Sequence, residues 1–224
     1  VEKAISDGMR GMAITDHGNM MGVKEFFNIV KKKNAPVFGE IKELRKKIAE
    51  ESKKESPNEA LIAQAEQDIA TAQKRIFKPI FGCEMYVAER TMHDKTKELD
   101  SRRYHLVVLA KNKTGYHNLI KLVSHAWTDG FYSKPRTDHN ELMKYREGLI
   151  VCSACIAGEV PRRILANDIA KAEDVILWYK NVFGEDYYLE LQRHEVKDPT
   201  QKANRDTFPE QQRANVELIR MDQK

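Results

Sequence analysis

The sequence is poor in cysteine and tryptophan, with three and two of these residues in 224. An odd, sparse set of cysteines disfavours a disulfide-stabilised secreted domain. The CSAC motif at 152–155 stands alone, without the second CxxC pair of a zinc ribbon. Cys83 and Cys152 fall within apolar strand patterns, where a small buried side chain is the expected role. The remaining thiol, Cys155, is left as a candidate metal ligand.

Long hydrophobic runs are also missing. No segment approaches the roughly 18 apolar residues that a membrane-spanning helix needs, and the N-terminus lacks the charged-then-apolar order of a signal peptide. We therefore expect a cytoplasmic protein with no membrane partner. The GxGxxG, GxxxxGK[ST] and GxSxG motifs are absent as well, so nucleotide-cradling loops and serine nucleophiles have no support in this sequence.

The excess of positive over negative charge is small. The formal net charge is +4 and the isoelectric point is near 8.8, which permits contact with nucleic acid but is weaker than the basic patch of a dedicated DNA-binding domain. Both ends of the sequence read as helix interiors, VEKAISDG at the start and QRANVELIRMDQK at the close, and there is no initiator Met. We therefore expect a segment of a longer protein.

Strand and helix patterns alternate along most of the chain. Apolar strand patterns occupy 11–15, 79–88, 103–110, 148–154 and 186–192. Helical spacing of apolar residues begins after Gly22 and ends in a lysine-rich turn near Lys33, recurs at 114–127 with Thr114 as the expected N-cap, and recurs at 164–184 with Asp168 capping and Gly184 ending the helix. This alternation predicts an α/β fold with a mainly parallel sheet.

A charged insertion interrupts the alternation. Residues 40–76 contain almost no β-branched or aromatic run, and two narrow apolar stripes are separated at Pro57. The pattern predicts two helices folded back on one another, an inserted helical hairpin within a single domain spanning 1–224.

Four side chains with metal-ligand chemistry lie in or beside strand patterns: His17, Glu84, His105 and Cys155. Imidazole, carboxylate and thiolate bind zinc, and the first two also suit manganese or iron. Asp16, next to His17, is a candidate to accept a hydrogen bond from an imidazole N–H or to orient a ligand without binding the metal itself. The spacing is long range, and a single histidine at a strand end is more often a structural, hydrogen-bonded residue, so both interpretations stay open at this point.

The loop DGFYSKPRTD interleaves aromatic rings with cations. Single-stranded nucleic-acid sites combine these groups, so Lys134 and Arg136 are candidate nucleic-acid contacts. An ordinary surface turn is the competing interpretation.

Taken in order, several motifs closely resemble the PHP (polymerase and histidinol phosphatase) domain at the N-terminus of bacterial replicative DNA polymerase III alpha subunits: TDHGNMMG, GCEMYVA, YHLVVLAKNKTGYHNLIKLVS, GFYSKPR, GLIVCSACIAGEVPR and YLELQRH. The resemblance covers nearly the whole chain except the segment 40–76. It implies an irregular β/α barrel with a cluster of divalent metal ions, zinc or manganese, at the strand ends. For this chain we expect an incomplete barrel.

The resemblance implies that His17, Glu84, His105 and Cys155 are metal ligands. Further ligands of the family come from motifs that would lie before Val1 and after Lys224, so four of the usual nine are present and a complete cluster is not expected in this chain alone. The implied chemistry is metal-dependent 3′ to 5′ exonuclease proofreading, with DNA, the proofreading exonuclease subunit and other replicase subunits as partners. Nucleotidyl transfer by a DNA-directed DNA polymerase is implied for the parent protein only.

Two alternatives remain beside this function. Some family members have lost the ligands and serve as a scaffold that docks the separate proofreading exonuclease subunit. A small-molecule phosphoesterase of the histidinol phosphatase kind is disfavoured, because SACIAGE and GFYSKPR are typical of the polymerase branch. Whether this chain hydrolyses DNA stays open at the level of sequence.

Overall fold

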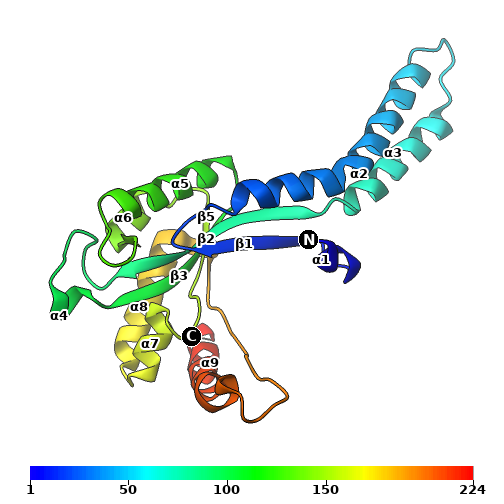
Figure 1. The fold of residues 1–224 in the computed structure, drawn as a ribbon. Coiled ribbons are helices and arrows are strands. Elements are labelled where there is room, and N and C mark those ends of the chain that lie inside the picture. The colour runs from blue at the N-terminus through cyan, green and yellow to red at the C-terminus, as the bar shows by residue number, and fades with distance from the viewer. Residues whose placement is uncertain (224) are drawn as a thin grey trace. The chain divides into compact units, whose positions relative to one another are not determined.

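The computed structural model describes residues 1–223, which form helices and a mixed β-sheet (Figure 1). The chain falls into two compact units. The first comprises Val1–Ile14 and Gly22–Ile80, and the second comprises Thr15–Met21 and the chain from Phe81 onward. All four predicted metal ligands belong to the second unit.

The strands follow the order β1-β2-β3-β5-β6, and β4 pairs with β2. Their bounds are Gly11–His17 for β1, Lys78–Ala88 for β2, Arg103–Ala110 for β3, Arg136–Thr137 for β4, Leu149–Cys152 for β5 and Tyr187–Tyr188 for β6. The last strand is shorter than the pattern at 186–192 predicts, because only Tyr187 and Tyr188 pair with β5.

The mixed α/β class is confirmed, and the mainly parallel sheet is confirmed in part. β2 pairs with β4, and β5 with β6, in parallel. β3 is antiparallel to both β2 and β5. The chain returns from β2 to β3 with only the short helix α4 (Lys97–Asp100) between them, and such a direct return gives an antiparallel pair, whereas a parallel pair needs a longer crossover. The incomplete barrel stays a prediction.

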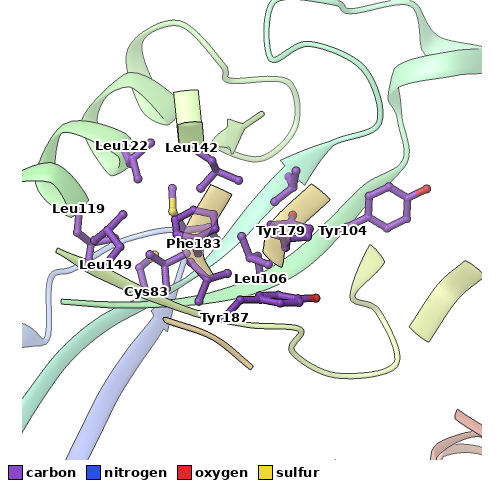
Figure 2. Close-up of a cluster of buried hydrophobic side chains, with 14 residues drawn as sticks. Cys83, Tyr104, Leu106, Leu119, Leu122, Leu142, Leu149, Tyr179, Phe183 and Tyr187 are labelled. Atoms are coloured by element: carbon purple, nitrogen blue, oxygen red, sulfur yellow. The ribbon is translucent and has the colours of Figure 1, made fainter. Parts of the chain in front are cut away.

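One face of the central strands builds the core of the second unit. Successive side chains of a strand point to opposite faces, so Cys83, Met85 and Val87 of β2 point together into a buried cluster. Figure 2 shows this cluster, in which Leu106 of β3 and Leu149 of β5 lie among side chains from three helices. The helical contributions include Leu119, Leu122, Leu142, Tyr179 and Phe183. Residues between these on β2 and β3 are thereby directed to the opposite face.

The helices of the second unit are α5 (Lys113–Thr128), α6 (His139–Lys144), α7 (Glu159–Leu165), α8 (Ile169–Phe183) and α9 (Phe208–Asp222), with short turns η1 (Gly184–Asp186) and η2 (Ala203–Thr207). The predicted ends of α8 are confirmed. The Asp168 carboxylate accepts a hydrogen bond from the Lys171 N–H, and Gly184 ends the helix with φ of +58°.

The predicted cap of α5 is wrong by two residues. Asn112, not Thr114, is the N-cap, and its side-chain oxygen accepts the Gly115 N–H at 2.9 Å. Asn112 is extended, with φ of −155°, as an N-cap residue is, so Thr114 falls inside the first turn. The first turn also lies against the backbone ahead of β5, since a Cβ on Gly115 would approach the Gly148 carbonyl oxygen to 1.7 Å.

In the first unit, α1 spans Glu2–Ser6, α2 spans Val23–Glu51 and α3 spans Glu59–Lys74. α2 and α3 lie side by side (Figure 1). The predicted lysine-rich turn near Lys33 is wrong, because α2 continues through it and through Pro36. A proline inside a helix removes one backbone hydrogen bond. The helix continues because Ile41 beyond the proline is buried and Glu40 forms an ion pair with Arg75 at 2.5 Å.

A buried asparagine closes the base of this hairpin. The Asn34 side chain donates to the Phe77 carbonyl at 2.8 Å and accepts the Phe77 N–H at 3.0 Å.

We predict that replacing residues 42–72 by a short Gly-containing loop leaves the second unit folded, because the apolar stripes of α2 and α3 pack against one another. Retention of a cooperative thermal transition and of near-UV circular dichroism checks this expectation. Loss of both would show that the hairpin supports the rest of the chain.

Candidate metal centre

Three strands each direct one ligand side chain to a common point. His17 ends β1, Glu84 lies within β2 and His105 lies near the start of β3. Their ligand atoms all lie within 4.8 Å of one another. A carboxylate oxygen of Glu84 is 2.5 Å from His105 Nδ1, and its other oxygen is 3.3 Å from His17 Nε2. The carboxylate therefore bridges the two imidazoles.

Strand alternation and register explain why Glu84 and His105 meet. Cys83 and Met85 face the core, so Glu84 and Tyr86 face the opposite side of β2. The antiparallel register places His105 opposite Tyr86 and Val107 opposite Glu84. Glu84 and His105 are therefore diagonal neighbours on one face, within reach of each other's side chains.

The turn after His17 explains the sequence DHG. Gly18 has φ of +67°, a region that residues with a Cβ rarely adopt. A Cβ there would also approach Pro135 Cγ to 2.8 Å and the Tyr86 ring to 3.1 Å. The Gly18 N–H donates to the Glu84 carbonyl at 2.9 Å. The chain thus turns tightly against β2 and leaves His17 beside Glu84.

Cys155 lies at the edge of this group. Its Sγ is 3.7 Å from His105 Nδ1 and accepts the Ala157 N–H at 3.4 Å. It is not among the three residues whose ligand atoms are mutually within 4.8 Å, so the structure brings three of the four predicted ligands together and places the fourth next to one of them. The Asp16 backbone carbonyl accepts the Cys83 thiol at 3.3 Å, and an orienting role for the Asp16 carboxylate stays a prediction.

The charges of the site are coupled. Hydrogen bonds to Cys155 and Glu84 raise the pKa of His105 to about 9 despite its partial burial. The His105 hydrogen bond lowers the pKa of the Glu84 carboxyl, against the effect of desolvation. A metal ion bound by His105 would therefore have to displace the proton that these hydrogen bonds hold on the imidazole.

The residues present fit a divalent metal ion. Two imidazoles and one carboxylate converging within one coordination sphere form a common donor set for zinc, manganese or iron. The His17 side chain is 59% exposed, whereas those of Glu84 and His105 are 17% and 23% exposed. The two less exposed donors thus come from β2 and β3, and the donor set is open to solvent at His17.

Tyr86 is part of this site, although sequence reasoning missed it. Its ring centroid lies 5.3 Å from that of His105 and 6.4 Å from that of His17. Its side chain is buried and its ring packs against both imidazoles. The available signal was its spacing, since a residue two positions after Glu84 on a strand faces the same side.

The two predicted nucleic-acid contacts differ in their exposure to solvent. Lys134 is exposed, with Nζ 5.8 Å from the centre of the Tyr86 ring. Arg136 is 1% exposed and donates to backbone carbonyls of Gly130, Met92, Asp94 and Asp100. The prediction is wrong for Arg136, because a guanidinium enclosed by four carbonyl groups is not available to a phosphate.

The metal-free protein is expected to lose stability at alkaline pH. The pKa of His105 is raised from an unfolded value near 6.5 to about 9. Its stabilising effect is therefore fully present below about pH 6.5 and is lost as pH rises through about 9. Urea denaturation in EDTA should show the free energy of unfolding falling by about 2 kcal/mol over this window. The change should be much smaller in His105→Gln, and an equal decrease in that variant would assign it to another group.

The chain belongs to the PHP domain family, whose model matches residues 1–194. The family and the geometry agree, since the three converging ligands come from strands within the matched region.

Among curated proteins, the chain is similar to DNA polymerase III alpha subunits. It is 39% identical over 199 residues to that of Borreliella burgdorferi, covering 88% of this chain and 14% of that protein. It is 33% identical over 193 residues to that of Thermus aquaticus, covering 85% and 12%. It is 30% identical over 225 residues to that of Aquifex aeolicus, covering 98% and 16%. The chain thus spans less than one fifth of the length of these relatives.

None of the helices in residues 1–223 combines the length and the hydrophobicity that a membrane-spanning helix needs.

Proposed function

We propose that this chain is the metal-binding PHP segment of a bacterial DNA polymerase III alpha subunit, and that its centre takes part in 3′ to 5′ exonucleolytic proofreading. The convergence of His17, Glu84 and His105 within 4.8 Å carries this proposal. The similarity to alpha subunits supplies the substrate, the 3′ end of a DNA strand. DNA synthesis itself, and the other replicase subunits as partners, belong to the longer protein in this proposal.

The residues have distinct roles in the proposed reaction. Glu84 and His105, the less exposed pair, and His17, the most exposed of the three, would together hold the ion, and the terminal phosphodiester would reach it from solvent. Divalent metal ions supply a bound water of lowered pKa and neutralise the phosphate oxygens. Because Glu84 contributes the single carboxylate of the three, a divalent ion there keeps a net positive charge and attracts a phosphate. Cys155 is positioned to join as a ligand from the side of His105.

Docking of the proofreading exonuclease subunit is the alternative. It keeps the fold and does not require turnover at the metal centre. Metal content together with 3′-end hydrolysis favours the first function, whereas tight binding of the exonuclease subunit without hydrolysis favours the second.

Metal content per chain, measured by elemental mass spectrometry, is the first test. It is best measured on this chain and on the longer polypeptide that contains it, purified without chelator. Two or three zinc or manganese ions in the longer protein would support the cluster. His17→Ala or Cys155→Ala should lower the content by at least one ion, and unchanged content removes that residue from the ligand set.

Hydrolysis is tested on a labelled single strand with a 3′ end, in the same metal-loaded protein. Loss of nucleotides from the 3′ end that stops on addition of EDTA supports proofreading. A metal-loaded protein that leaves the strand intact but binds the exonuclease subunit supports the docking function. A metal-free protein under gentle purification contradicts the proposed centre.

A further inference from the structure

Two aromatic rings form an exposed stack close to the metal centre. Trp127, at the end of α5, and Phe131, in the loop that follows, have ring centroids 5.6 Å apart and ring planes inclined by 23°. They are 46% and 44% exposed. Large aromatic side chains usually bury most of their surface, so a stacked pair left half exposed requires an explanation.

A hydrogen bond connects the stack to the metal centre. The Trp127 indole N–H donates to the Gly18 carbonyl at 2.8 Å, and Gly18 directly follows the predicted ligand His17. This bond restrains the rotation of the indole and ties it to the turn that follows His17. The stack is therefore joined to the backbone of the residue that follows His17, within the second unit.

The loop that carries Phe131 is rigidly built. The buried Arg136 guanidinium donates to the Gly130 carbonyl at 3.2 Å and lies 5.1 Å from the centre of the Tyr132 ring. A Cβ on Gly130 would approach the Arg136 carbonyl oxygen to 1.9 Å. Ser133 holds φ of +63°, and the Tyr132 N–H donates to the Lys134 carbonyl at 3.0 Å. A loop with this many internal constraints keeps Phe131 exposed in a fixed place.

Two cations lie near the aromatic ring that contacts both histidines. Lys134 Nζ and the Arg103 guanidinium are 5.8 Å and 5.7 Å from the centre of the Tyr86 ring, and that ring also contacts the two histidines. Positive charge beside an exposed aromatic stack matches a polyanion that carries flat bases. An apolar protein surface would match the rings but would leave both cations without a counter-charge.

We propose that Trp127 and Phe131 are a stacking platform for the bases of single-stranded DNA, with Lys134 contacting its phosphates. The platform positions the strand so that its 3′ end reaches His17, Glu84 and His105. This inference rests on the proposed function for the identity of the ligand and assigns new residues to substrate positioning. Stacking on aromatic side chains tolerates any base, as an enzyme that removes any mispaired terminal nucleotide requires.

The test is binding of a fluorescein-labelled oligodeoxythymidylate of about 12 nucleotides to the 224-residue chain, followed by anisotropy in EDTA. EDTA keeps the strand intact and separates binding from the metal centre. Phe131→Leu removes the aromatic face but keeps an apolar side chain, and it should weaken binding about tenfold. Phe131→Tyr keeps the face and should bind like the unmodified chain. Thermal melting of each variant confirms that it is folded.

A second oligonucleotide separates stacking from other effects. A strand of the same length with abasic sites has the phosphates but lacks the bases. Phe131→Leu should therefore bind this abasic strand as tightly as the unmodified chain binds it. Lys134→Gln should lower the slope of log affinity against log salt concentration by about 1. The Lys134 side chain is exposed. The salt dependence of Lys134→Gln is therefore a readout that does not depend on the folding of the Phe131 variants.

Three results would overturn the platform: no binding of the normal strand by the unmodified chain, equal binding by Phe131→Leu, or equal weakening of normal and abasic strands by that variant. Failure of the proposed function is a different result. In that case metal content is absent or hydrolysis is not seen, while the dependence on Phe131 in EDTA persists. Conversely, a metal-loaded protein that hydrolyses DNA but is insensitive to Phe131→Leu retains the function and loses the platform.

Discussion

Arg136→Met is expected to destabilise the protein by about 3–5 kcal/mol, the range for removing one partner of a buried charged network. The guanidinium satisfies carbonyls of Met92, Asp94, Asp100 and Gly130 at 2.9–3.2 Å. Methionine fills much of the volume but donates no hydrogen bond, so these acceptors lose their partner in a site where Arg136 is 1% exposed. Urea denaturation monitored by far-UV circular dichroism gives the free energy of unfolding.

Two variants control this measurement. Lys134→Met removes a cation from the same loop at an exposed position and should change stability by less than about 0.5 kcal/mol. Arg136→Lys keeps the charge but lacks the planar arrangement of five donors, so it should remain well below the stability of the unmodified chain. Equal stability of Arg136→Met and Lys134→Met would show that the carbonyl network contributes little.

This pair of residues also shows where sequence reasoning stops. Lys134 and Arg136 lie two positions apart in a loop rich in aromatics, and nothing in the order of residues distinguishes an exposed cation from a buried one. A strand or helix has a period that assigns faces, but a loop has none. The burial of Arg136 follows from the return of the chain as β4 along β2, a long-range pairing that the sequence does not encode locally.

Local signals were sufficient for most elements of the fold. Apolar runs located the long strands, and Asp168 and Gly184 located the ends of α8, because caps and positive φ angles are short-range properties. The continuity of α2 was not predicted, since Pro36 and the preceding lysines indicate a break. Burial of Ile41 and packing of α2 against α3 override that local preference.

The site was predictable to the extent that its chemistry lies on strands. His17, Glu84 and His105 have ligand side chains in apolar strand patterns, and the resemblance to PHP domains grouped them. Their convergence depends on the register of β2 and β3, which the sequence pattern does not determine. Tyr86 and Trp127 were missed because aromatic residues at these spacings are ordinarily core residues, and their contacts with His105 and Gly18 arise only in the folded chain.

Glu84→Gln is expected to reduce affinity for the bound metal ion by more than about 100-fold, because removing a direct ligand should exceed the 10–100-fold cost of losing an outer partner. Glu84 contributes the carboxylate that lies against both imidazoles, 2.5 Å from His105 and 3.3 Å from His17. Glutamine keeps the shape and one carbonyl oxygen but removes the negative charge that offsets the charge of the cation. Zinc or manganese titration followed by calorimetry, with elemental analysis of the purified variant, measures the effect.

Glu141→Gln is the matched control, because Glu141 also accepts from an imidazole, that of His125 at 2.7 Å, and this pair lies on helices α5 and α6 rather than on the three strands. It should bind metal like the unmodified chain, which shows that losing a carboxylate–imidazole pair is not in itself sufficient. In EDTA, Glu84→Gln should also lower the pKa of His105 from about 9, since Glu84 is one of the two groups that raise it. Retention of the metal ion at unchanged affinity in Glu84→Gln would remove the carboxylate from the ligand set and leave the two histidines without the charge that makes this a cation site.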